Sequence, residues 1–263
     1  MKPQRIFITG GASGLGFALA QICAKGGWRV CIGDRDIERG EAVIGSLQKF
    51  QHQAMFMPCD VTRVSDIEQV AKKLDDEWGG VDVVVNNAGV AQVGQLAQTT
   101  LNDWQWIIDI NLLGVVRGCK VFTPMFKRQG HGHFVNVASM AGLLDVPNMS
   151  AYNATKAAVV SLSETLQNEL KKDNIHVTVV CPSFFKTNLG QGMRTSIDGM
   201  EQKLDKLMRS SKLNAVDIAR MIMKAVEKKK THVLPHRQGR MAWYMKRFLP
   251  RSWYQKLLYS RMK

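Results

Sequence analysis

The sequence is poor in acidic residues and has no long apolar run. Asp and Glu number 22 against 36 Lys and Arg, so the formal net charge is +14 and the isoelectric point about 9.7. No run approaches the roughly 20 apolar residues of a membrane-spanning helix, and no signal-peptide pattern precedes the strand-like run at Arg5. We therefore expect a cytoplasmic protein whose positive charge favours an anionic partner, such as a membrane surface, a nucleic acid or an acidic ligand.

The cysteines and histidines form no recognisable metal or catalytic cluster. The five cysteines are scattered, with no Cys-x-x-Cys pair, at Cys23, Cys31, Cys59, Cys119 and Cys181. This pattern is typical of small apolar fillers in a reducing compartment. The six histidines lack the partners or spacing of a Ser-His-Asp triad. We expect no metal site.

Apolar strand-like runs alternate with helical stretches along the chain. The runs cover about 5–9, 28–33, 54–57, 81–85, 133–138, 175–181 and 231–235. This alternation predicts an α/β fold with a doubly wound parallel sheet. We place a single domain at residues 1–240 and a basic tail at 241–263, since nothing in the composition before the tail divides the chain.

A glycine-rich turn, Thr9-Gly-Gly-Ala-Ser-Gly-Leu-Gly16, joins the first predicted strand to a helical stretch. Glycine lets the backbone approach a pyrophosphate, and the helix N-terminus offers free N–H groups and a positive dipole end. The spacing differs from the Gly-x-Gly-x-x-Gly of the standard fingerprint. Between a strand and a helix, it still predicts a dinucleotide site, with contacts from Gly10, Ser13, Gly14, Leu15 and Gly16.

Acidic residues end the second and third predicted strands. A carboxylate at Asp34 would accept hydrogen bonds from ribose hydroxyls and repel a 2′-phosphate, which favours NAD. Arg35 could instead bind a 2′-phosphate, which leaves NADP open. Asp60 could accept from the adenine amino group. The alternative for both acids is a turn or helix-capping role.

Tyr152 and Lys156 are four residues apart in a run of helix formers, so they share one helix face. A nearby cation lowers the pKa of a phenol, which would suit Tyr152 as general base for an alcohol or general acid for a carbonyl. Ser139, at a strand end, can bond the same substrate oxygen. Taken alone, the Tyr–Lys pair fits an amphipathic surface pair better than a catalytic one.

Taken in order, the motifs of this chain resemble those of the classical short-chain dehydrogenase/reductase family. The matching stretches are Thr9–Gly16, Asp60-Val61, Asn86–Gly89, Asn111, Ser139, Tyr152-x-x-x-Lys156 and Cys181-Pro-Ser, within about residues 5–235. The resemblance implies a Rossmann fold with strand order 3-2-1-4-5-6-7. It also implies hydride transfer between a nicotinamide cofactor and an alcohol or ketone.

The resemblance also implies residue roles. Tyr152 would be the acid/base, Lys156 would hold the nicotinamide ribose, and Ser139 would orient the substrate oxygen. Asn111 would hold a relay water, and Thr187 would fix the nicotinamide carboxamide. Further cofactor contacts would come from Asp60, Val61, Asn87, Ala88, Gly89 and Pro182. Family members are commonly homodimers or homotetramers, packed through the helices that carry Asn111 and Tyr152.

The chain departs from the family pattern at two places. Pro182 is followed by Ser183 where the family usually has glycine, so the loop beside nicotinamide could differ. Asp34-Arg35 mixes the NAD-type and NADP-type signals.

Residues 184–212 correspond to the substrate cover of this family. Their apolar residues, together with those of the loop before Tyr152, predict a hydrophobic, lipid-like alcohol or ketone. The alternative is that an amphipathic lid packs its own stripe on the body. These residues are Phe184, Phe185, Leu189, Met193, Ile197, Met200, Leu204 and Leu207, with Met140, Leu143, Leu144 and Met149.

The tail mixes aromatic and basic residues, and no acid follows Glu227. This composition predicts peripheral membrane contact through 241–263, with packing on the body or on a partner subunit as the alternative. The residues concerned are Trp243, Tyr244, Trp253, Tyr254, Leu257 and Leu258 with Lys246, Arg247, Arg251, Lys256 and Arg261.

The sequence fits two other functions less well than it fits an oxidoreductase. A regulatory or sensor protein that binds NAD(P) with little turnover would not need Ser139, Tyr152 and Lys156 together. Specific nucleic-acid binding is not expected, because no recognised module is present and charge alone gives only salt-sensitive affinity.

Overall fold

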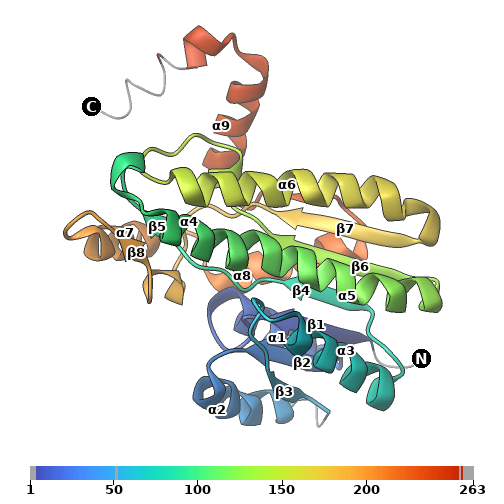
Figure 1. Cartoon of the computed structure of the whole chain (residues 1–263). Coiled ribbons are helices and arrows are strands. Elements are labelled where there is room, and N and C mark those ends of the chain that lie inside the picture. Colours follow the sequence, from blue (N-terminus) through green and yellow to red (C-terminus); the bar gives the residue numbers. More distant parts are fainter. Residues whose placement is uncertain (1–3, 51–52, 255, 257–263) are drawn as a thin grey trace.

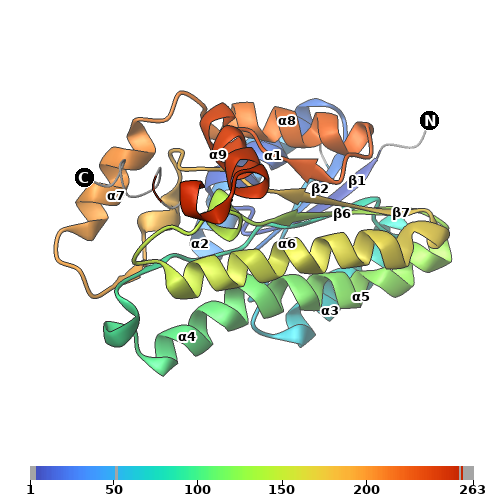
Figure 2. The ribbon, with the colours of Figure 1, turned by 90° about the horizontal axis from the view of Figure 1, so that it is seen from above.

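A parallel seven-stranded sheet forms the centre of the molecule, with helices on both faces (Figures 1 and 2). The structure, a computed structural model, describes residues 4–50, 53–254 and 256. The order β3-β2-β1-β4-β6-β7-β9 confirms the predicted topology once the strands outside this sheet are left out of the count. Its strands are β1 Arg5–Thr9, β2 Arg29–Asp34, β3 Met55–Pro58, β4 Val83–Asn86, β6 Gly132–Val137, β7 Ile175–Val180 and β9 His232–Val233.

Each face of the sheet has its own helices and its own buried cluster. Helices α1, α2 and α8 cover one face, and α3, α5 and α6 cover the other (Figure 2). The helices are α1 Gly14–Lys25, α2 Ile37–Gln48, α3 Val64–Trp78, α4 Leu101–Ile108, α5 Gly114–Gln129, α6 Ser150–Leu170, α7 Met200–Arg209, α8 Ala215–Glu227 and α9 Arg237–Phe248. Short 3-10 turns lie at η1 Leu96–Gln98, η3 Met140–Gly142, η4 Lys171–Asp173 and η5 Asn188–Gly190.

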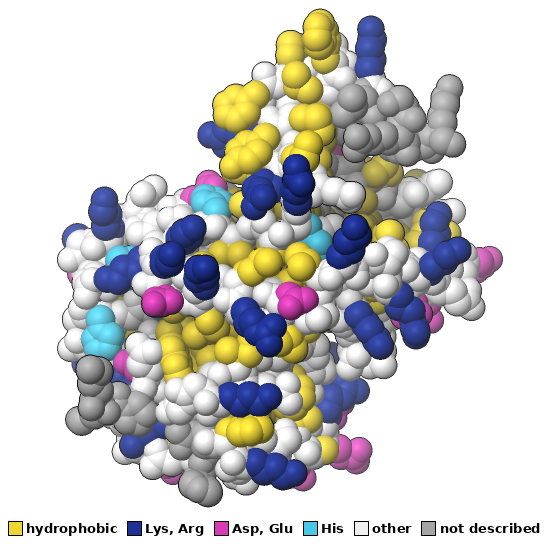
Figure 3. Space-filling model, turned by 180° about the vertical axis from the view of Figure 1, so that it is seen from behind, with side chains coloured by type: hydrophobic (Ala, Val, Ile, Leu, Met, Phe, Trp, Pro, Cys, Tyr) yellow, Lys and Arg dark blue, Asp and Glu magenta, His cyan; other side chains and the backbone are white. Residues whose placement is uncertain are grey.

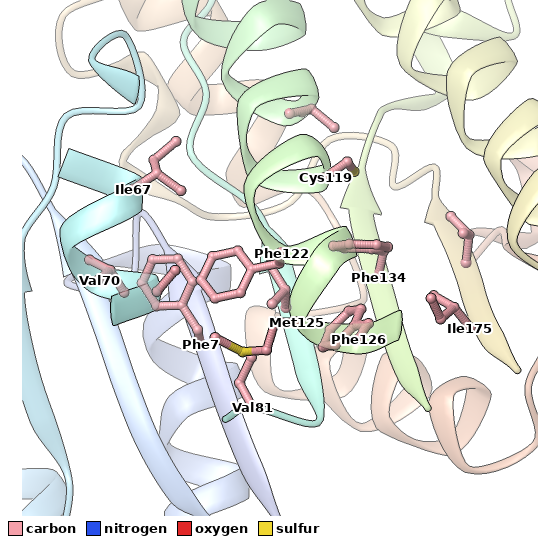
Figure 4. Close-up of a cluster of buried hydrophobic side chains, with 14 of the residues drawn as sticks. Phe7, Ile67, Val70, Val81, Cys119, Phe122, Met125, Phe126, Phe134 and Ile175 are labelled. Atoms are coloured by element: carbon pink, nitrogen blue, oxygen red, sulfur yellow. The ribbon is translucent and has the colours of Figure 1, made fainter. Parts of the chain in front are cut away.

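The strands are apolar almost throughout because both sheet faces are covered. Along β1, Phe7 points to the cluster under α3 and α5, whereas Ile6 and Ile8 point to the cluster under α1. The Phe7 ring lies 5.5 Å from the ring of Phe122, centroid to centroid, on α5 (Figure 4). The five cysteines are buried free thiols.

The helical region from Leu101 to Gln129 is interrupted at a π-helical turn and not at its proline, Pro124. A π-helical turn, η2 Asp109–Leu113, separates α4 from α5 and carries the buried Asn111. Pro124 lies inside α5, on its exposed side. The carbonyl that a proline leaves unbonded belongs to Lys120, which is also exposed and can bond water there.

Two elements at the edges of the fold extend what the sequence indicated. Strands β5 Gln92–Val93 and β8 Arg194–Thr195 form a small parallel sheet that ties the 184–212 segment to the body. Helix α9 begins at Arg237, four residues before the predicted start of the tail. Leu257, Leu258 and Arg261 lie outside the described residues. Among the helices that the structure describes, none has the length and apolar character needed to cross a bilayer.

The close contact of α1 with the glycine-rich turn gives a stability test. A Cβ at Gly16 would overlap the Gly10 carbonyl oxygen and lie 2.7 Å from Asn87 Nδ2. We expect Gly16→Ala to lower the free energy of unfolding in urea by about 1–3 kcal/mol, because backbone cannot yield as a flexible side chain can. Gly45→Ala, on the exposed side of α2 with nothing within 4 Å, should raise it by about 0.5–1 kcal/mol. Equal effects of both substitutions would contradict this packing.

Candidate active site

A cavity of about 550 Å³ opens at the carboxyl ends of the parallel strands. It lies where the strand order reverses between β1 and β4, the position at which open α/β sheets bind ligands. Of the predicted site residues, all but Gly16 and Asn111 line it. Gly16 packs behind Gly10, and Asn111 is fully buried beside Gly89.

The glycine-rich turn is shaped to receive a dinucleotide. Gly10 and Gly14 have φ angles of +63° and +52°, a region that residues with a side chain rarely adopt. Helix α1 begins at Gly14, so its first N–H groups face the cavity without partners within the helix. Thr187 lies over this turn, since a Cβ on Gly14 would be 3.4 Å from the Thr187 Cβ. These residues fit a pyrophosphate held against the helix N-terminus.

Asp34 closes the turn and faces the cavity. Its Oδ2 accepts from the Ala12 N–H at 3.1 Å, and its Oδ1 accepts from the Asp36 N–H at 3.1 Å. The helix cap that was the alternative for Asp34 is supplied by Asp36, which accepts from the Arg39 N–H. Each Asp34 oxygen keeps a lone pair for a ribose hydroxyl. Arg35 is exposed at the cavity edge.

Asp60 also serves a turn as well as the cavity. Its Oδ1 accepts from the Thr62 N–H at 2.9 Å and from the Thr62 hydroxyl at 2.8 Å. Burial alone would raise the pKa of Asp60, but these bonds and the positive charges of Arg63 and Arg35 lower it. Asp60 is therefore a carboxylate, able to accept from a nucleotide base. The neighbouring Val61 packs on Gly114.

Thr9 was missed as a site residue, although it stands in the turn motif. Its hydroxyl accepts from the Asn87 N–H at 3.0 Å and the Ala88 N–H at 3.1 Å. Asn87 Nδ2 in turn donates to the Thr9 and Gly10 carbonyls at 3.0 and 3.1 Å. The end of β4 is thus held against the glycine-rich turn. A polar residue buried at a strand end is the signal that could have indicated it.

A second polar group that was missed lies beneath the cavity. Asn86 Nδ2 donates to Asn136 Oδ1 at 2.8 Å, and Asn136 Nδ2 donates to Ser163 Oγ at 3.0 Å. All three side chains are buried. Because buried polar groups are costly when unpaired, this chain fixes β4, β6 and α6 in one relative position.

Ser139, Tyr152 and Lys156 come together from β6 and α6. Both α6 residues are buried, at 7% and 4% exposure, and Lys156 Nζ lies 5.8 Å from the centroid of the Tyr152 ring. Lys156 Nζ donates to the Val137 carbonyl at 2.9 Å. Ser139 Oγ accepts from the Ala141 N–H at 3.1 Å. The turn after β6 can pack closely on α6 because Gly142 has no side chain. A Cβ at this position would lie only 2.5 Å from the Lys156 carbonyl carbon.

The electrostatics of the tyrosine differ from the prediction. Burial raises the pKa of Tyr152, and a hydrogen bond with Ser139 opposes that rise. The prediction that the pKa of Tyr152 is lowered is wrong for this arrangement, because the effect of burying the phenol dominates. Burial lowers the pKa of Lys156 to about 8. Tyr152 is therefore a neutral phenol at neutral pH, the form that donates a proton.

Asn111 is braced rather than free. Its Oδ1 accepts from the Val90 N–H at 2.8 Å, and its Nδ2 donates to the Val90 carbonyl at 2.9 Å. This pair holds the π-helical turn against the strand β4 exit at Gly89. The water relay implied for Asn111 stays a prediction.

The 184–212 segment closes one side of the cavity with apolar side chains. Met193, Leu204 and Met208 are buried in the cluster that also holds Tyr152, so part of the stripe packs on the body. The wall of the cavity is formed by Met140, Leu144, Met149, Phe184, Phe185, Leu189, Leu204 and Met208. Within the described part of the chain, no group of three or more His, Cys, Asp or Glu could hold a metal.

Comparisons with known proteins agree with this geometry. A family model described as short chain dehydrogenase matches residues 4–198. The CLA biosynthesis dehydrogenase/reductase of Lactiplantibacillus plantarum is 32% identical over 191 residues, which cover 72% of this chain and 67% of that protein. A short-chain dehydrogenase/reductase from Burkholderia phymatum, solved in complex with NAD, is 30% identical with a TM-score of 0.87 and covers 93% of both chains. An alcohol dehydrogenase from Thermococcus sibiricus, complexed with 5-hydroxy-NADP, is 26% identical with a TM-score of 0.76 over 89% of this chain and 96% of that one.

The family model matches most of this chain. The two similar proteins named first are matched over two thirds or more of their own length. This protein belongs to the short-chain dehydrogenase/reductase family of nicotinamide-dependent oxidoreductases.

Proposed function

We propose that this oxidoreductase acts on a hydrophobic, lipid-like ketone or the corresponding alcohol, with Tyr152 as its acid/base. The observation that carries the proposal is the position of Tyr152 between two surroundings. Ser139 and Lys156 lie beside it, and Tyr152 also belongs to the buried apolar cluster that holds Met149 and Leu204. A carbonyl can meet the phenol while its apolar chain follows the cavity wall.

The proposed chemistry assigns each polar group one task. In reduction, Tyr152 donates its proton to the carbonyl oxygen, and in oxidation it takes that proton back. The Ser139 hydroxyl donates a hydrogen bond to the same oxygen. Lys156 holds α6 against the end of β6 through the Val137 carbonyl, and its amine would also bind the nicotinamide ribose. The nicotinamide cofactor, when bound, supplies or accepts the hydride.

A substrate screen with one tyrosine variant tests this assignment. We expect NADH- or NADPH-dependent turnover of 2-ketones to rise with chain length, since each buried methylene adds about 0.8 kcal/mol. Tyr152→Phe should lower kcat by roughly 10²–10⁴-fold and leave cofactor affinity nearly unchanged, because only the proton donor is lost. Tyr244→Phe, on exposed α9, is the control.

Two outcomes would contradict the proposal in different ways. Retained turnover in Tyr152→Phe would reject the assigned acid/base. Cofactor binding without turnover of any ketone or alcohol in the screen would favour a regulatory or sensor protein.

We propose further that NAD is preferred over NADP. The support is the Asp34 carboxylate in the cavity wall, held by two backbone N–H groups at the turn. A 2′-phosphate beside it would meet a like charge. Arg35 and Arg39 also line this end of the cavity and act in the opposite sense.

Removing that charge should change the cofactor preference. In Asp34→Asn, we expect the ratio of kcat/KM with NADH to kcat/KM with NADPH to fall by about 5–30-fold, equivalent to about 1–2 kcal/mol of relieved repulsion. Glu38→Gln, an exposed residue of α2 outside the cavity wall, makes the same change in net charge and should leave the ratio unaltered. An unchanged ratio in Asp34→Asn would reject Asp34 as the selector.

We propose a homodimer or homotetramer packed through α4, α5 and α6. These helices lie side by side on one outer side of the molecule (Figure 2). Leu101 on α4 and Leu113 at the π-helical turn are 84% and 40% exposed there, which favours a covering partner.

We also propose that the protein is cytoplasmic and contacts membranes peripherally through α9. The helix has two opposite faces. Trp243 and Lys246 face the body, where Trp243 packs on the core and Lys246 bonds the Leu143 carbonyl and Asp145. Tyr244 and Phe248 lie on the other face and are 48% and 75% exposed.

The outer face of α9 stands clear of the body as an apolar strip flanked by basic residues (Figure 3). Trp253, beyond the end of α9, is 66% exposed, and exposed basic residues of this part of the chain include Arg240 and Arg251. Aromatic and basic residues together suit an anionic lipid interface. Both alternatives for the tail thus receive support, one from each face of the helix.

Vesicle sedimentation tests the outer face. We expect the protein to partition onto anionic phosphatidylserine-containing vesicles more than onto neutral ones, and the double variant Tyr244→Ser, Phe248→Ser to lose at least about tenfold in binding through its smaller buried apolar area. Met221→Ser, at an exposed apolar site on α8, should bind as the original chain does. Equal partitioning of the double variant would end the idea.

A further inference from the structure

One peptide group beside the catalytic residues is held from both sides. The carbonyl of Pro182 accepts from the Met140 N–H at 2.8 Å and from the Ser139 hydroxyl at 3.4 Å. The N–H of Ser183, in the same peptide group, donates to Nδ1 of His236 at 3.0 Å. In a trans peptide the C=O and N–H point in opposite directions, so the bond to His236 fixes the direction of the carbonyl at Ser139.

The contacts of His236 select one form of its ring. The Ser211 hydroxyl lies 3.0 Å from the Leu213 carbonyl, to which it donates, and 3.4 Å from His236 Nε2. Its single hydrogen is used on Leu213, so it can only accept from Nε2. Nε2 therefore carries the hydrogen, and Nδ1 keeps the lone pair that receives the Ser183 N–H. Burial lowers the pKa of His236, in agreement with this neutral form.

His236 joins three parts of the chain at this point. It is the N-cap residue of α9, it bonds the loop that follows β7, and through Ser211 it contacts the segment that ends the lid. Its ring also lies 6.4 Å from the Phe185 ring in the cavity wall. The backbone at Ser183 does not have a positive φ, so the position does not require glycine. Among the described residues, the non-glycine residues with positive φ are Asn148, Asn174 and Lys229. The departure from Pro-Gly is thus accommodated, with the N–H of Ser183 given to His236.

We propose that His236 is a positioning residue for catalysis. It holds the Pro182–Ser183 peptide group, whose carbonyl accepts from the Met140 N–H and so keeps the neighbouring Ser139 side chain in place beside Tyr152. When a substrate is bound, the Ser139 hydrogen turns from the Pro182 carbonyl, 3.4 Å away, to the substrate oxygen. The inference rests on the proposed role of Ser139. It makes the seating of α9 on the body part of what sets the catalytic geometry.

Three substitutions of His236 distinguish the loss of the Nδ1 hydrogen-bond acceptor from the loss of the size of the imidazole ring. Asparagine can place an oxygen where Nδ1 stands, whereas glutamine reaches toward the Nε2 position and leaves the Ser183 N–H unbonded. We expect His236→Ala and His236→Gln to lower kcat for ketone reduction by about tenfold, the effect of a lost buried hydrogen bond, with a smaller change in KM for the ketone. His236→Asn should stay within about threefold of the original kcat.

His131→Asn is the matched control. His131 is exposed between α5 and β6 and lies 3.0 Å from Asp82, away from Ser183 and α9. Its kcat and KM should be unchanged. If the alanine variant unfolds, the asparagine and glutamine variants decide the question. Their kcat values are compared at a temperature well below the melting temperature of both. Full activity of His236→Gln, or equal losses in His236→Asn and His236→Gln, would overturn the inference.

A double variant separates this inference from the proposed function. If His236 acts through Ser139, then His236→Gln should add little to the loss caused by Ser139→Ala. Full activity of Ser139→Ala would reject the proposed role of Ser139. A large loss in Ser139→Ala together with a fully additive loss from His236→Gln would reject only the route through His236.

Discussion

The buried bond between Lys156 and the Val137 carbonyl is the contact on which the catalytic end of the molecule depends. It joins α6 to the last residue of β6 at 2.9 Å, and Gly142 allows the approach. Burying an amine disfavours its charged form, which is why its pKa falls to about 8. The bond to a carbonyl repays part of that cost. It also fixes Tyr152, one turn earlier, beside the strand end that carries Ser139.

The same arrangement explains why the site is polar at one end and apolar at the other. Parallel strands end at one edge of the sheet, so the turns after β1, β2, β3 and β4 collect the groups that face a nucleotide. The segment between β7 and α8 then covers the far end with apolar side chains, held in place by the pairing of β8 with β5. The two regions meet at Tyr152, the residue proposed as the acid/base, and burial keeps its phenol neutral near neutral pH.

The C-terminal segment links this site to the surface. His236 lies between the loop after β7 and α9, and Lys246 of α9 bonds the loop that contributes Leu144 to the cavity wall. One face of α9 is therefore part of the structure around the site, while the opposite face carries exposed aromatic residues.

The sequence by itself determined the topology and the members of the site. The strand order and the set of Ser139, Tyr152 and Lys156 follow from the ordered family motifs, and the glycine-rich turn and Asp34 follow from patterns local to the strand ends. The spacing of Tyr152 and Lys156 indicates only that they share a helix face. Only the tertiary structure decided the state of those residues. The pKa of Tyr152 depends on its burial by distant segments. The Asn111 side chain is hydrogen-bonded to the backbone of Val90, and His236 accepts from the N–H of Ser183, 53 positions earlier in the chain. Such contacts carry no local period or spacing, because their partners are brought together by packing of the whole domain.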